Sequence, residues 1–92
     1  MKVTFSEGAN GDLDREFAWI AKDNPRAAYK MIARIEARVR RLAAVNFPDM
    51  GRPGLIEGTR ELIEHPYLIV YQVDEAHSEV FVLAVVHGAQ DR

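Results

Sequence analysis

The side chains best suited to chemistry in this sequence are three histidines, His65, His77 and His87. Their spacing fits no metal site, because metal-binding motifs place their ligands at short, regular intervals. His87 closes an apolar run and precedes Gly88, and an imidazole there could serve as a general base. No second catalytic group lies near it in the sequence, so a hydrogen-bonded histidine at a strand end is the favoured interpretation. We therefore expect no metal, no cofactor and no catalytic residue.

An arginine–glutamate pair, Arg60 and Glu61, is the other candidate for a working site. Arg60 could be a surface cation that contacts a target or is held by a partner. It could instead pair with Glu64 or Asp49 and brace the neighbouring loop. The bracing interpretation is favoured, because most exposed ion pairs contribute little energy.

The composition indicates one soluble domain. The 92 residues are 48% hydrophobic and 28% charged, and such a chain buries a single modest core. There is no cysteine, which excludes disulfides and thiolate metal sites and agrees with a cytoplasmic protein. Neither a signal peptide nor a membrane span is expected, since no apolar stretch approaches the roughly 20 residues that a bilayer requires. A net charge of -2 argues against a protein that coats nucleic acid.

The elements that must position these residues follow the order β-α-α-β-β-β. Residues 2–6 alternate and predict a strand, and helical spacing of apolar residues follows. Asn24 can cap a second helix and Pro25 suits its first position, so this helix is expected from Pro25 to about Val45. The segment 46–58 is predicted to be a loop. Strands are then expected at 59–64, 67–74 and 79–87, which gives an α+β fold with a helical hairpin on a small antiparallel sheet.

The last two predicted strands, "YLIVYQV" and "VFVLAVV", are almost continuously apolar. Antiparallel strands with one wet face normally alternate apolar and polar residues. A helical hairpin covers only one face, so the other face is expected to be apolar and open. Such a patch usually marks a binding site. A partner or a second copy could cover it, and the alternative is that sheet twist and the long loop do so.

Short motifs along nearly the whole chain resemble those of one known family. They are "DL" at 12–13, "NPRAA" at 24–28, "GRPG" at 51–54, "GTREL" at 58–62, "PYLIVYQV" at 66–73 and "VVHGAQD" at 85–91. Their order and spacing resemble the ParE toxins of the ParE/RelE superfamily, the toxin halves of bacterial type II toxin–antitoxin modules. Each motif is weak alone, whereas together they are specific.

This resemblance implies a function and two partners. Characterised ParE toxins inhibit DNA gyrase and trap double-strand breaks, so a gyrase inhibitor without chemistry of its own is expected. The antitoxin would be a small ribbon-helix-helix protein of ParD type, whose flexible C-terminal segment wraps the toxin in a hetero-oligomer. No membrane contact and no sequence-specific nucleic-acid binding are expected.

Two alternatives remain open. Toxins of the RelE branch are ribosome-dependent mRNA endoribonucleases, and such cleavage needs cations near the scissile phosphate and a group that activates the 2′-hydroxyl. Ala84 and Gln90 occupy positions where ParE-like and RelE-like sequences often carry Arg, and the chain lacks the strong positive charge expected of a ribosome-binding enzyme. The same two residues keep open a non-toxic relative that only binds the antitoxin.

The resemblance directs attention to two groups of residues. Candidates for target contact are Arg60, His87, Gln90 and Arg92, which lie at the start of the predicted meander and in the closing "HGAQDR". Candidates for antitoxin contact are Trp19, Tyr67 and Tyr71, each of which could instead belong to the core. A basic stripe on the second helix, which includes Arg34, Arg38 and Arg41, is either a solvated face or an attraction for an acidic antitoxin tail.

Overall fold

A computed structural model describes residues 1–44 and 51–88. It has α+β architecture with the expected element order and one additional two-residue strand. The elements are β1 (Lys2–Phe5), α1 (Glu7–Ala21), α2 (Pro25–Ala44), β2 (Arg52–Pro53), β3 (Arg60–Glu64), β4 (Tyr67–Asp74) and β5 (Glu79–His87). The three C-terminal strands match the prediction to within one residue. Strand β2 lies in the segment predicted to be loop.

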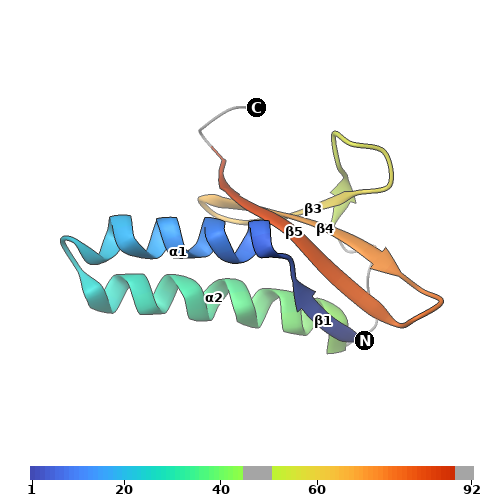
Figure 1. Ribbon diagram of the computed structural model, residues 1–92, viewed down its shortest axis with the longest axis horizontal. Helices are drawn as coiled ribbons and strands as arrows, with labels where there is room; N and C mark the ends of the chain where they lie inside the picture. The colour runs from blue at the N-terminus through green and yellow to red at the C-terminus, as the bar shows by residue number, and fades with distance from the viewer. Residues whose placement is uncertain (45–50, 89–92) are drawn as a thin grey trace.

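Both helices begin at side-chain caps. The Ser6 hydroxyl accepts a hydrogen bond from the Ala9 N–H at 3.0 Å, so α1 starts directly after β1. The Asn24 side-chain oxygen accepts from the Ala27 N–H at 3.1 Å, which confirms the predicted cap before α2. The two helices form the expected antiparallel hairpin, and Figure 1 shows it extending well past the sheet.

The sheet has the strand order β1-β5-β4-β3-β2 and is mixed (Figure 1). Strands β3, β4 and β5 form the predicted antiparallel meander, and β2 adds an antiparallel edge. The sheet differs from the expected antiparallel one at β1, which pairs with β5 in parallel. The helical hairpin causes this difference, because it carries the chain from β1 to the far edge of the sheet before β3, β4 and β5 return towards it.

Helix α1 continues the edge of β5 beyond the last residue that β1 pairs. The Asp12 carboxylate accepts a hydrogen bond from the Val85 N–H at 2.9 Å. The Ser6 hydroxyl donates to the Leu83 carbonyl at 3.1 Å. The β5 edge is therefore closed by a strand over one half and by helix side chains over the other, which prevents pairing with another chain.

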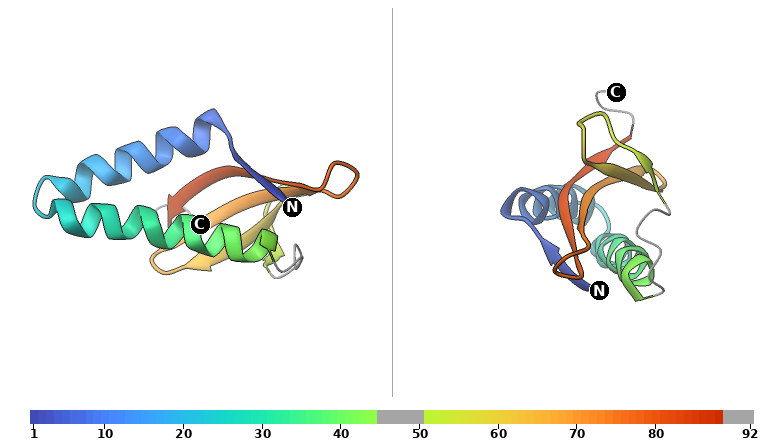
Figure 2. Two further views of the ribbon diagram at one scale, coloured as in Figure 1. Left: turned by 90° about the horizontal axis from the view of Figure 1, so that it is seen from below. Right: turned by 90° about the vertical axis from the view of Figure 1, so that its right-hand side faces the viewer.

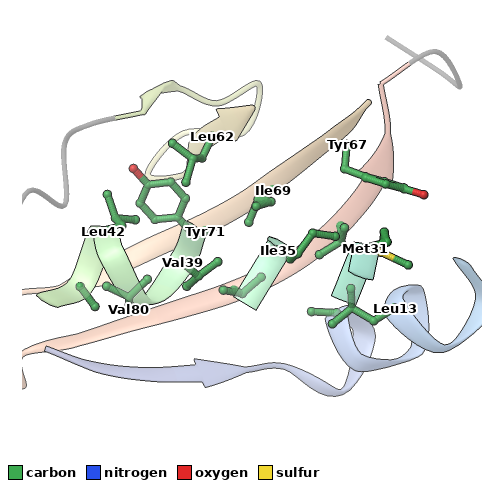
Figure 3. Close-up of a cluster of buried hydrophobic side chains, with 14 residues drawn as sticks. Leu13, Met31, Ile35, Val39, Leu42, Leu62, Tyr67, Ile69, Tyr71 and Val80 are labelled. Carbon is green, nitrogen blue, oxygen red and sulfur yellow. The ribbon is translucent and has the colours of Figure 1, made fainter. Parts of the chain in front are cut away.

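The core lies between α2 and one face of the sheet (Figure 3). Side chains of Met31, Ile35, Val39 and Leu42 from α2 are buried against the strands and form an apolar stripe with helical spacing. The sheet contributes the buried residues Leu62, Tyr67, Ile69, Tyr71, Val80, Val82 and Val85. Leu13 joins them from α1, whose remaining length has few buried residues.

The other face of the sheet, here called the open face, is apolar as predicted. The register places Ile63 beside Leu68, Leu68 beside Val86, and Val70 beside Ala84. Ile63 is 53% exposed, Val70, Ala84 and Val86 are half-buried, and Leu68 is buried. The open face is thus partly covered within the chain, and its exposed apolar area is greatest at the β3–β4 end.

Candidate functional site

A pocket of about 440 Å³ opens at the β3–β4 end of the open face. Its apolar lining comes from Ile63, Leu68 and the turn that contains Pro66. Arg52, His65 and His87 add nitrogen-bearing side chains, and no carboxylate belongs to its lining among the described residues. The pocket therefore combines an apolar lining with a few polar groups, as ligand pockets commonly do.

His87 and Tyr67 separate this pocket from a second hollow beside α1. Their rings meet edge to face, with centroids 5.6 Å apart and an interplanar angle of 77°. Burial of the Tyr67 phenol raises its pKa above 10.0, the nearby Glu16 raises it further, and Arg34 opposes both. His87 lies at the end of β5, as predicted, and its ring packs against the ring of Tyr67.

The second hollow, about 870 Å³, is lined mainly by α1. Trp19 belongs to its lining and is 69% exposed, so the alternative that Trp19 packs in the core is wrong. The physical reason is that α1 extends past the sheet at this point (Figure 2), and no strand covers it. Lys22 places its ammonium 5.0 Å from the centre of the indole ring. Trp19 thus offers an apolar surface to a partner.

Tyr67 and Tyr71 lie on the same face of β4, as predicted, but that face is the one beneath the helices. Tyr71 is fully buried and its hydroxyl accepts a hydrogen bond from the Gly51 N–H at 3.2 Å. Tyr67 is 6% exposed. Of the two interpretations left open for these tyrosines, the structure shows the core position, because their place in the strand turns them towards α2.

The arginines of the basic stripe on α2 fall into two groups, those that pair with the sheet and those that are exposed. Arg34 donates to the Glu64 carboxylate at 3.1 Å and to the His65 carbonyl at 2.7 Å. Arg38 also lies 3.6 Å from the Glu64 carboxylate. These two arginines tie α2 to the end of β3, whereas Arg41 is exposed to solvent. The sequence pattern could not distinguish these groups, because Glu64 is 30 residues from Arg34.

Arg60 braces the loop, as the favoured interpretation held, although its partner differs from those expected. Its guanidinium donates to the Gly51 carbonyl. Glu64 is engaged by the arginines of α2, and Asp49 lies outside the described residues. Gln90 and Arg92 also lie outside them, so their candidacy for target contact stays a prediction.

Sequence analysis did not single out Arg52, which the structure places at the pocket. Its guanidinium lies 3.2 Å from Glu61, whose side chain is almost fully buried on the open face. The only signal was the motif "GRPG", which was noted as part of a family pattern. Within residues 1–44 and 51–88, no group of three His, Cys, Asp or Glu side chains could hold a metal ion. In the same part of the chain no helix is long and apolar enough to cross a bilayer.

Comparison with known proteins decides the family. The family model described as "ParE toxin of type II toxin-antitoxin system, parDE" matches residues 3–92. The chain belongs to the ParE toxin family. A relative from Sinorhizobium fredii, named "Putative toxin Y4kP", is 42% identical over 80 residues, which cover 85% of this chain and 78% of the relative.

Solved structures place this ParE toxin among toxins of two related kinds. The chromosomal ParDE system of P. aeruginosa contains a chain with 26% identity and a TM-score of 0.79, with 95% of each chain covered. The RelBE2 complex of Mycobacterium tuberculosis contains one with 26% identity and a TM-score of 0.63, over 94% of this chain and 95% of that one. The E. coli RelBE complex, at 14% identity, a TM-score of 0.64 and 98% coverage of both chains, shares the fold. This ParE chain is therefore the toxin component of a type II system of ParDE/RelBE type.

Proposed function

We propose that this toxin inhibits DNA gyrase in the cytoplasm by stabilising its cleavage complex with DNA, and that it performs no chemistry itself. A ParD-like ribbon-helix-helix antitoxin neutralises it. Membership of the ParE family supports the target, and the similarity to the P. aeruginosa ParDE system supports the antitoxin.

The observation that carries the proposal is the shortage of available cations on the sheet. Cleavage of RNA requires positive groups around the scissile phosphate and a base for the 2′-hydroxyl. Along β3, β4 and β5 the only lysine or arginine is Arg60, whose guanidinium is directed to the Gly51 carbonyl. Arg52 on β2 is paired with Glu61. Neither arrangement resembles a phosphate site, and both favour a toxin that acts by binding.

The antitoxin contact is assigned to the helices. Arg26, Lys30 and Arg41 are exposed on α2, and Trp19 is exposed on α1. An acidic antitoxin segment would be attracted to the cations, and a buried indole is a frequent centre of binding energy at protein interfaces. The antitoxin therefore needs neither Tyr67 nor Tyr71.

Induction of the toxin in bacteria tests the proposal. We expect growth arrest with chromosomal DNA breaks, while mRNA mapped by primer extension stays intact. DNA breaks should disappear when the antitoxin is expressed together with the toxin. Growth arrest without DNA breaks would contradict a gyrase poison.

Deletion of residues 88–92 is predicted to abolish toxicity and to leave antitoxin binding largely intact. The reason is that the deletion removes Gln90 and Arg92, the candidates for target contact that follow β5 in the sequence, and removes none of the residues assigned to the antitoxin. Toxicity is measured by colony counts after induction, and antitoxin binding by co-purification. Loss of both properties in a folded variant would refute this division between the two surfaces.

The runner-up is an mRNA endoribonuclease of RelE type. It is favoured by the similarity to the RelBE2 toxin structure and by the contact of Tyr67 with His87 beside Arg52. An enzyme of this kind would leave cuts in mRNA at fixed positions within codons. Primer extension after induction therefore separates the two functions in a single experiment.

A further inference from the structure

The most exposed large apolar side chains of the described residues are adjacent to each other. Leu55 is 76% exposed and Ile56 is 71% exposed. They lie in the connection between β2 and β3, here called the hairpin tip and defined as residues 54–59, which projects from the sheet in Figure 1. Neither side chain is part of the core, so their apolar character contributes little to folding. An exposed apolar pair of this kind is typical of an interaction surface.

The hairpin tip has a defined conformation. The Gly54 N–H donates to the Thr59 carbonyl at 2.8 Å, and the Thr59 N–H donates to the Ile56 carbonyl at 3.0 Å. The Thr59 hydroxyl donates to the same carbonyl at 2.5 Å. Gly58 has a φ of +85°, and a Cβ on Gly54 would lie 2.2 Å from the Thr59 hydroxyl oxygen. Because the backbone is already ordered, little conformational entropy remains to be lost when the tip binds.

We propose that Leu55 and Ile56 insert into an apolar cleft of the target protein and anchor the toxin to it. The inference rests on the proposed function, in which the toxin acts by binding a protein target. The contact surface is the hairpin tip, whose residues belong neither to the pocket lining nor to the basic stripe of α2.

The chemistry of the hairpin tip identifies a protein partner. Residues 54–59 contain no lysine or arginine, and the exposed Glu57 directly follows the apolar pair. DNA phosphates would be repelled by that carboxylate and would gain no cation from the tip. An apolar cleft, by contrast, gains from the burial of two aliphatic side chains.

The position of the hairpin tip favours the target over the antitoxin. The surface assigned to the antitoxin includes Trp19 and the cations of α2. Figure 1 shows α2 and the hairpin tip on opposite sides of the sheet, and the turn between α1 and α2 at the end of the molecule away from the tip. A toxin that holds its antitoxin through the helices thus presents the tip on the other side of the sheet.

The test uses the full chain with the double substitution L55S/I56S, and a control, L55I/I56L, that keeps both positions apolar. With purified gyrase and plasmid DNA, L55S/I56S should need at least about tenfold more toxin than the unmodified chain to give the same linear DNA, since two buried aliphatic contacts are lost. The control should stay within about twofold of it. Thermal unfolding and antitoxin co-purification should be unchanged in both variants, because the side chains lie outside the core.

Three other results of the gyrase, antitoxin and light-scattering measurements overturn the inference. Equal gyrase poisoning by L55S/I56S would leave the gyrase proposal standing and remove the tip as its anchor. Loss of antitoxin binding would assign the tip to the antitoxin, and a change in oligomeric state measured by light scattering would assign it to a second copy. If the unmodified chain does not poison gyrase, the proposed function fails, and the role of the tip is then measured by growth inhibition. Retained toxicity of L55S/I56S would overturn its role in target contact. Lost toxicity, with the L55I/I56L control still toxic, would support that role for another target.

Discussion

Replacement of Tyr71 by alanine should destabilise this toxin by about 3–5 kcal/mol, the range measured when a large aromatic side chain is removed from a core. The Tyr71 ring is fully buried in the core between the sheet and α2. Its hydroxyl also accepts a hydrogen bond from the Gly51 N–H, so the variant loses the link between the core and Gly51. Since small domains are stable by about 5–15 kcal/mol in total, Y71A should be partly or largely unfolded at growth temperature.

Urea unfolding followed by circular dichroism measures this effect, with Tyr71→Phe as the matched control. The phenylalanine keeps the ring and removes only the hydroxyl, so its cost should be about 1 kcal/mol. A Y71A variant destabilised by less than about 1.5 kcal/mol would show that Tyr71 is not the centre of the core.

Replacement of Asp12 by alanine should cost about 1–3 kcal/mol, because it leaves the buried N–H of Val85 without its acceptor. The same carboxylate pairs with Arg15 one turn along α1, a contact at the surface that adds little. The main expected result is that the second half of the β5 edge separates from α1. Hydrogen exchange at the Val85 amide should therefore accelerate more than exchange in β3.

Asp12→Asn is the control, since its side-chain oxygen can still accept from Val85. It should retain most of the stability and most of the amide protection. Equal losses in D12A and D12N would mean that the charge of Asp12, rather than the hydrogen bond to Val85, holds α1 against the sheet.

Local patterns were sufficient to predict most of the fold. The cap at Asn24, the proline that follows it and the apolar stripe of α2 are each set by residues a few positions apart, and each is confirmed. The parallel pairing of β1 with β5 was not predicted, since it joins segments about 77 residues apart. The contact of Asp12 with Val85 was not predicted for the same reason, since the two residues are 73 positions apart.

The residues of the candidate site were harder to predict than the fold. Trp19 and Tyr71 both carry aromatic side chains, but Tyr71 belongs to a strand whose inner face is covered by α2, whereas Trp19 lies near the end of α1, which extends past the sheet (Figure 1). Exposure therefore depended on how far α1 extends past the strands, which no local pattern encodes. Arg34 likewise binds Glu64 through the packing of α2 on β3, and a stripe of cations cannot indicate which of its members are engaged.

The most direct test of the central claim is a plasmid cleavage assay with purified gyrase, first with the toxin alone and then with its antitoxin. The account predicts that linear, protein-linked DNA accumulates as toxin is added and that the antitoxin prevents it. Unchanged supercoiling and no linear DNA, with active gyrase and a folded toxin, would contradict it.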